Sequence, residues 1–93
     1  MRIFEKTNIA ASSTTVVAGA SVALRYVTVN TTANAVVNIY DAATSAACST
    51  TNSVGVLKAN IVEGTYRYDC IMKNGITVFT AGASDITVVY ERI

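Results

Sequence analysis

The side chains best suited to chemistry in this 93-residue chain are its carboxylates, because the sequence contains no histidine. Histidine is the commonest general base and metal ligand in proteins. The six acids are Glu5, Asp41, Glu63, Asp69, Asp85 and Glu91. Hydrolysis by paired carboxylates needs two acids about 5–9 Å apart in a cleft, and the spacing of these acids indicates no such pair. No stretch is rich enough in carboxylates for calcium, which takes about 6–8 oxygens, so Asp41 and Asp85 are expected to bind backbone amides at strand ends.

Nucleophile and phosphate-binding motifs are also missing. No Gly-x-Ser-x-Gly elbow occurs among the many serines, and the five glycines are isolated rather than grouped in a phosphate loop. Cys48 and Cys70 are too few for a zinc site, which takes about four Cys or His ligands. Met1–Lys6 carries charges where a secretory signal needs an apolar run, so two free thiols are expected, with a disulfide as the alternative. We therefore expect a protein that is not an enzyme, with no catalytic, cofactor-binding or metal-binding residues.

The elements that would position these residues are strands, and they are clearest near the carboxyl end. Thr65–Met72 and Ile76–Thr80 alternate in polarity and are joined by Lys73, Asn74 and Gly75, and Asn-Gly between such segments predicts a β-hairpin. Asp85–Glu91 is then a returning strand. The side chains expected to face the core are Tyr66, Tyr68, Cys70, Met72, Ile76, Val78, Thr80, Ile86, Val88 and Tyr90.

The first half of the chain alternates with the same period of two. It predicts strands over Ser12–Ala18, Val22–Thr32, Ala35–Asp41 and Val54–Ala59. Val27 and Val29 are expected to face the core beside Ala23, and Ala35–Asp41 reads as the partner of the strand that contains them. The low-complexity run Ala42–Ser53 is expected to be a loop that contacts something, with a helix as the alternative.

Together these segments predict one small all-β domain. Seven to eight short strands with close turn signals favour an antiparallel β-sandwich, either immunoglobulin-like or jelly-roll. Residues 12–93 are expected to form the sandwich, and residues 1–11 an N-terminal arm or edge strand. A chain of 93 residues has room for one such domain.

Charge is scarce and evenly spread. Charged residues make up 14% of the chain, against about 25% in an average globular domain. The seven basic residues form no stripe, so nucleic-acid binding is not expected. No apolar run reaches the roughly 20 residues that span a bilayer, so no membrane partner is expected. Edge strands without proline and with few charges pair readily with other chains, which favours an assembly subunit, with a small soluble domain as the alternative.

Four segments resemble small β-sandwich structural proteins of tailed bacteriophages. They are Leu24–Asn30, Val37–Asp41, Glu63–Asp69 and Asn74–Glu91, and the similarity is one of pattern, with no site residue to transfer. It implies a non-enzymatic virion protein, made in the host cytoplasm, that acts as a capsid decoration (cement) protein bridging and stabilising head subunits. Its partners would be the major capsid protein or other virion proteins, and further copies of itself in a homo-oligomer. The alternatives are a tail or neck subunit, or a tail-tip glycan-binding module that uses an exposed tyrosine such as Tyr26 or Tyr40.

Overall fold

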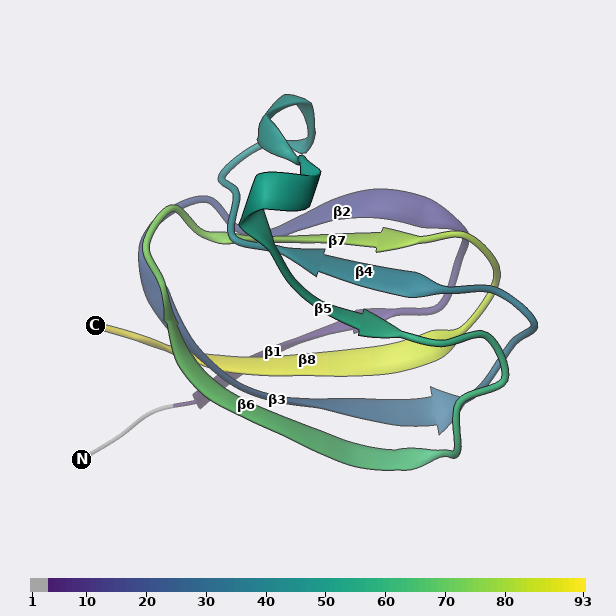
Figure 1. Cartoon of the computed structure of the whole chain (residues 1–93). Coiled ribbons are helices and arrows are strands. Elements are labelled where there is room, and N and C mark those ends of the chain that lie inside the picture. The colour runs from purple at the N-terminus through teal and green to yellow at the C-terminus, as the bar shows by residue number, and fades with distance from the viewer. Residues whose placement is uncertain (1–3) are drawn as a thin grey trace.

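The computed structural model describes residues 4–93, which form eight strands in two four-stranded sheets (Figure 1). The strands are β1 (Phe4–Ile9), β2 (Ser13–Ala18), β3 (Val22–Thr31), β4 (Val37–Tyr40), β5 (Ser53–Leu57), β6 (Gly64–Met72), β7 (Ile76–Thr80) and β8 (Asp85–Arg92). Two single-turn 3-10 helices, η1 (Ser45–Ala47) and η2 (Thr50–Asn52), lie between β4 and β5. Sheet A has the order β1-β8-β3-β6, sheet B has the order β2-β7-β4-β5, and all pairings are antiparallel.

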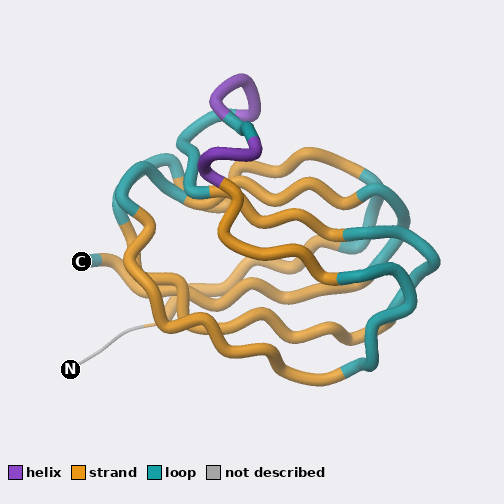
Figure 2. The backbone as a smooth tube through the Cα atoms, viewed as in Figure 1, coloured by secondary structure: helices purple, strands orange, loops and turns teal. Residues whose placement is uncertain are grey.

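The expected antiparallel β-sandwich is confirmed, and its strand order is that of a jelly roll. Successive strands alternate between the two sheets except at β4 and β5, so the chain winds around the core (Figures 1 and 2). Eight strands wound in this way into two sheets correspond to the second of the two expected architectures. Every predicted strand is present, with bounds shifted by a few residues.

The predicted hairpin between Thr65–Met72 and Ile76–Thr80 is wrong, because these strands lie in different sheets. β6 pairs with β3 in sheet A, whereas β7 pairs with β2 and β4 in sheet B. Residues 73–75 therefore form a corner between the sheets. A corner and a hairpin turn need the same residue types, so the Asn-Gly signal did not separate them.

The corner itself is built around a glycine and an aspartate. Gly75 has a φ of +144°, which L side chains rarely adopt, and a Cβ there would collide with the carbonyl oxygen of Ala18. The carboxylate of Asp41 accepts the backbone N–H groups of Lys73 (3.2 Å) and Asn74 (2.8 Å). Asp41 thus binds backbone amides at a strand end, as predicted, and it ties the corner to the end of β4.

Two other predicted pairings are also wrong. Asp85–Glu91 does not return along β7, because β8 lies between β1 and β3 in sheet A. Ala35–Asp41 does not pair with the long strand β3, because β4 lies between β5 and β7 in sheet B. Alternation of polarity identifies a strand and its buried face but contains no information about its neighbours.

A bulge at Arg25 decides which residues of β3 face the core. Arg25 is an extra residue relative to β8, so the side-chain alternation restarts after it. Leu24, before the bulge, and Val27 and Val29, after it, all belong to the core cluster. Val27 and Val29 therefore lie where the sequence predicts, whereas Ala23, expected beside them, is buried on the outer side of sheet A.

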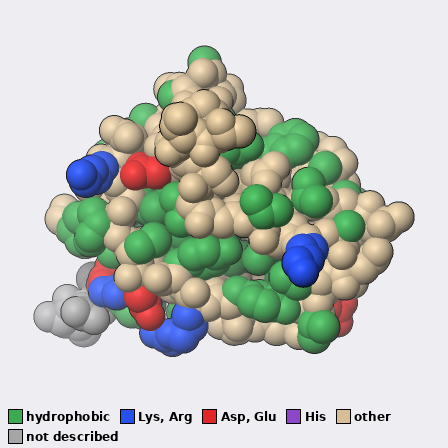
Figure 3. Space-filling model, viewed as in Figure 1, with side chains coloured by type: hydrophobic (Ala, Val, Ile, Leu, Met, Phe, Trp, Pro, Cys, Tyr) green, Lys and Arg blue, Asp and Glu red, His purple; other side chains and the backbone are tan. Residues whose placement is uncertain are grey.

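The core lies between the two sheets. The largest fully buried apolar side chains are Leu24, Ile39, Met72, Ile76 and Ile86. The predicted inner faces of β6, β7 and β8 are confirmed, with Tyr66, Tyr68 and Cys70 partly buried against the core. Hydrophobic side chains are visible along the side between the edge strands β5 and β6 (Figure 3).

The N-terminal segment and the long loop complete the fold. Phe4–Ile9 is an edge strand paired along its whole length with β8, so this part is not a free arm, and Met1–Ile3 lie outside the described residues. The predicted loop Ala42–Ser53 contains the two short 3-10 helices and projects beyond sheet B (Figure 1). Its shape is held by Asn52, whose side-chain amide donates to the carbonyl of Ala47 and accepts the N–H of Ser49.

Candidate interaction surface

The three aspartates of the described chain each bind different partners. Asp41 binds the corner amides, Asp69 binds arginines, and Asp85 accepts the side-chain amides of Asn8 (2.7 Å) and Asn30 (3.4 Å). Asp85 therefore binds side-chain amides, which corrects the expectation that it would bind backbone amides. Within residues 4–93 no group of three or more Cys, Asp or Glu side chains is placed to hold a metal ion.

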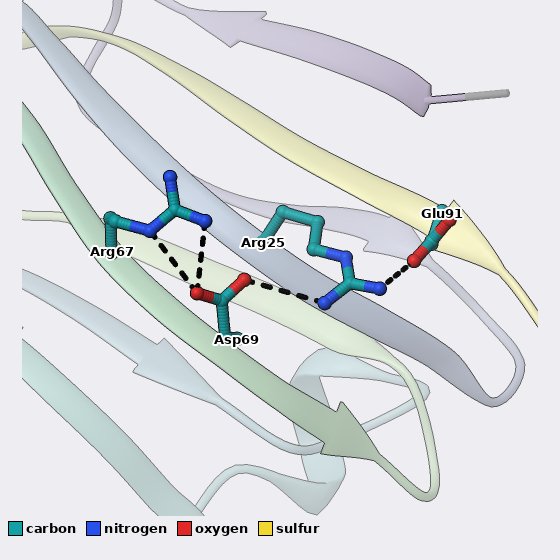
Figure 4. A network of polar contacts seen from close by, with 4 residues as sticks. All are labelled: Arg25, Arg67, Asp69 and Glu91. Atoms are coloured by element: carbon teal, nitrogen blue, oxygen red, sulfur yellow. Dashed lines mark hydrogen bonds and ion pairs between the residues drawn. The ribbon is translucent and has the colours of Figure 1, made fainter. Parts of the chain in front are cut away.

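The outer side of sheet A carries an ionic network across three strands (Figure 4). Arg25 on β3 donates to Glu91 on β8, and its other terminal nitrogen lies 3.3 Å from the carboxylate of Asp69 on β6. Arg67 binds the second oxygen of Asp69 through Nε (3.1 Å) and Nη2 (3.0 Å). The Phe4 ring lies 6.0 Å from the Arg25 guanidinium. Through these contacts the network links the side chains of β3, β6 and β8.

The network also shifts the proton affinities of its members. The hydrogen bond to Glu91 raises the pKa of Arg25 despite the opposing effect of burial. Burial alone would raise the pKa of Asp69, but the hydrogen bonds and charges of Arg67 and Arg25 outweigh it and lower that pKa. Both groups thus stay ionised at neutral pH, and neither is suited to general acid–base catalysis.

The outer side of sheet B is entirely different, because β2, β4, β5 and β7 contain no charged residue. We call this surface the neutral face. It consists of Thr14, Val16, Asn38, Tyr40, Val56 and Phe79, which alternate with the core residues of the same strands. Thr77 lies on the same side of the sheet but is fully buried, with its hydroxyl donating to the carbonyl of Ala42. In contrast, the strands of sheet A carry Glu5, Lys6, Arg25, Arg67, Asp69, Asp85, Glu91 and Arg92.

Apolar side chains stand out from the neutral face. The register places Thr14, Phe79, Asn38 and Val56 side by side in one row across all four strands. Val56 is 53% exposed, Val16 is 45% exposed and Phe79 is 38% exposed. Asn38 lies between Phe79 and Val56 in this row, so the exposed apolar side chains are interspersed with neutral polar ones. Exposed apolar side chains gathered on one uncharged face favour an interaction site.

The edge strands of the two sheets differ in the same way. In sheet A, β1 carries Glu5 and Lys6, and β6 carries Arg67 and Asp69 with a positive φ of 49° at Asp69. Charges and backbone irregularities of this kind discourage pairing with another chain. In sheet B, the edges β2 and β5 carry neither charge nor proline. Both strands also contain a bulge, at Val17 in β2 and at Val54 in β5, so the feature that favours strand addition at sheet B is the absence of charge from its edges.

The tyrosines and cysteines have mainly structural positions. Tyr26 lies on the outer side of sheet A and Tyr40 on that of sheet B, so the two cannot form one stacking platform. Tyr66, Tyr68 and Tyr90 pack against the core or within it. Cys48 and Cys70 are free thiols, and burial raises the pKa of both.

Sequence reasoning did not identify the neutral face. The signal was present, since the four segments Ser13–Ala18, Val37–Tyr40, Ser53–Leu57 and Ile76–Thr80 all lack charges. These segments form one uncharged surface only because the tertiary structure places all four in the same sheet.

Comparison with known proteins identifies the fold but no family. No family model and no curated protein matches the chain. Among solved structures, the chain is similar to the Drosophila NLP core, whose crystal structure is described as giving insight into pentamer formation and histone binding. The two share a TM-score of 0.57 and 15% sequence identity over 97% of each chain. A likeness at this identity shows that the two proteins share a sandwich fold.

No helix in residues 4–93 is long and apolar enough to cross a membrane.

Proposed function

We propose that this protein is a non-enzymatic virion structural protein of a tailed bacteriophage, a capsid decoration protein that bridges and stabilises head subunits. The observation that carries the proposal is the absence of charge from all four strands of sheet B, on its face and at both of its edges. Surfaces of this kind become covered in assemblies, because a neutral, partly apolar face loses little hydration when a partner covers it. The resemblance of the strand segments to phage β-sandwich proteins indicates which assembly.

In this mechanism the sandwich is a rigid block, and its sheet B edges and projecting loop make the contacts. A strand of a capsid subunit would add to β2 or β5, which lie at the edges of sheet B and carry no charged side chain. Because Phe4–Ile9 is paired with β8, it is not available to reach a neighbour as an arm. The Ala42–Ser53 loop, held by its own hydrogen bonds, remains the projecting element.

The likeness to the Drosophila NLP core supports a proposal that copies of this chain assemble, but not a proposal that the chain binds histones. The Drosophila NLP core is described in terms of pentamer formation, so rings of subunits are compatible with this fold. A homo-oligomer is accordingly part of our proposal. Histone binding is not, because histones are basic and this chain has a net charge of +1 with no acidic run.

The test is whether the protein binds phage heads. Phage particles from a culture of the organism that encodes the chain are purified, heads lacking the protein are prepared by deleting its gene, and purified protein is added back. We expect saturable co-sedimentation with the heads and a higher temperature of genome release. Bovine serum albumin at the same concentration controls for trapping. The decoration role would be refuted if particles that lack the protein released their genome at the same temperature as complete particles. It would also be refuted if the purified protein did not bind the heads that lack it. Protein found on tails alone would identify the tail or neck alternative.

A further inference from the structure

We infer that the neutral face is the contact surface between two copies of this chain. The inference deepens the proposed function, because it names the surface through which subunits of the decoration protein join. It begins from the exposure of Val16, Phe79 and Val56 on a sheet that is otherwise lined by Thr, Asn and Tyr.

Charge indicates that the occupant of this face is itself uncharged. A charged partner surface placed on the neutral face would lose its hydration and find no opposite charge there. The outer side of sheet A is ruled out as this partner, because it carries the network of Arg25, Asp69, Arg67 and Glu91. The neutral face of a second copy meets the requirement.

A neutral face is well suited to contact between two copies of the chain, because it avoids like charges facing each other across the symmetry axis. In a two-fold contact the same patch lies on both sides, so each residue near the axis faces its own copy. A lysine or glutamate at such a position would face a like charge. Phe79 and Asn38 lie opposite each other on the two central strands, β7 and β4, and neither carries a charge.

The projecting loop limits how two neutral faces can meet. The segment Ala42–Asn52 rises beyond sheet B at the end where β4 stops and β5 begins, and η1 lies against β2 (Figures 1 and 2). A two-fold axis parallel to the strands would bring the two loops together at the same end. An axis across the strands places them at opposite ends, where each loop flanks the partner's sheet. We therefore assign the axis across β7 and β4, near Asn38 and Phe79.

The first experiment measures self-association by sedimentation velocity over a wide concentration range. Val56→Glu and Phe79→Glu place a carboxylate on the neutral face at exposed positions, and Ile71→Glu places one on sheet A, where Ile71 is 57% exposed. We expect the wild type and Ile71→Glu to self-associate alike and the other two variants to do so at least about tenfold more weakly, because each buries an unpaired charge. Circular dichroism confirms that each variant is folded. If one neutral-face variant does not fold, the other gives the result.

The second experiment tests the position of the axis. Asn38→Cys and, as a control, Ile71→Cys are made in a chain whose native cysteines are replaced by Cys48→Ser and Cys70→Ala. A short bismaleimide, which spans the roughly 10 Å between two facing sheets, should join two copies through position 38, because a residue beside a two-fold axis lies near its own copy, but not through position 71.

Three results would overturn the inference: a wild type that is monomeric throughout, self-association that survives both neutral-face variants, or cross-linking through position 71 but not 38. These results are independent of the head-binding test. A monomer that binds heads would refute this inference alone, and an oligomer joined by the neutral face that binds no heads would refute the proposed function alone.

Discussion

Replacing Gly75 by alanine should destabilise the sandwich much more than replacing Gly64, although the two glycines have similar backbones. Their φ values are +144° and +149°. The space around them differs. A Cβ at Gly64 has nothing within 4 Å, whereas at Gly75 it would collide with the carbonyl of Ala18 and lie 3.1 Å from that of Ala42. The pair therefore separates the backbone cost, which both variants share, from the cost of close packing at the corner.

The magnitudes follow from these two terms. A residue with a side chain in this backbone region costs about 1–3 kcal/mol, and both variants carry that cost. Overpacking against two backbone carbonyls adds about 1–3 kcal/mol for Gly75→Ala, for a total of about 2–6 kcal/mol. With an unfolding entropy of about 0.2 kcal/mol/K for a domain of this size, Gly64→Ala should lower Tm by about 5–15 °C and Gly75→Ala by about 10–30 °C.

Thermal unfolding followed by circular dichroism measures both changes, and urea unfolding checks them at constant temperature. An unchanged urea m-value would show that neither variant alters the surface exposed on unfolding. Equal losses in the two variants would refute the reasoning, because the corner would then be able to relax around the added methyl group. A larger loss for Gly64→Ala would contradict the structure at the corner itself.

Two further predictions concern polar groups. Arg25 and Arg67 lower the pKa of Asp69 in the folded state, so the stabilisation that they give is complete above the unfolded pKa of about 3.9 and is lost as the pH falls through the lower folded value. Asp69→Asn, which tolerates the positive φ, should therefore unfold with a shallower pH dependence below about pH 4 in urea titrations. Thr77→Val should cost about 1–3 kcal/mol in urea unfolding, because the buried hydroxyl donates to the carbonyl of Ala42 at 2.9 Å.

One experimental result would contradict each of these two predictions. An Asp69→Asn profile that is superimposable on that of the wild type at acid pH would show that the arginines do not stabilise the fold through this carboxylate. A Thr77→Val variant as stable as the wild type would show that the carbonyl of Ala42 finds another donor. Thr14→Val, on the exposed part of the same face, is the matched control for the added methyl group.

The strands and their buried faces were predictable because the signal is local. The alternation of Ile76, Val78 and Thr80 with Thr77 and Phe79 lies in adjacent residues, and the structure buries the first set. Thr77 is buried as well, on the other side of the sheet, where its hydroxyl donates to the carbonyl of Ala42. The bulge at Arg25 was not predictable, because an extra residue in one strand is defined only relative to its partner. The error at Ala23 follows directly from it.

The candidate surface was predictable in composition but not in place. Low charge and edges without proline already indicated contacts with other chains. Which surface lacks charge depends on which strands share a sheet, and β2, β7, β4 and β5 come from four separate parts of the sequence. The ionic network also depends on which strands pair, since Arg25 on β3 is 44 positions from Asp69 on β6 and 66 positions from Glu91 on β8.

The sequence by itself determined that this protein is a β-sandwich with few charges, because side-chain alternation and composition act through neighbouring residues. Only the tertiary structure decided that the Asn74-Gly75 turn is a corner rather than a hairpin, that the charges collect on sheet A, and that sheet B is left neutral. Strand partners are selected by how the whole core closes, and that free energy is shared by residues from every part of the chain.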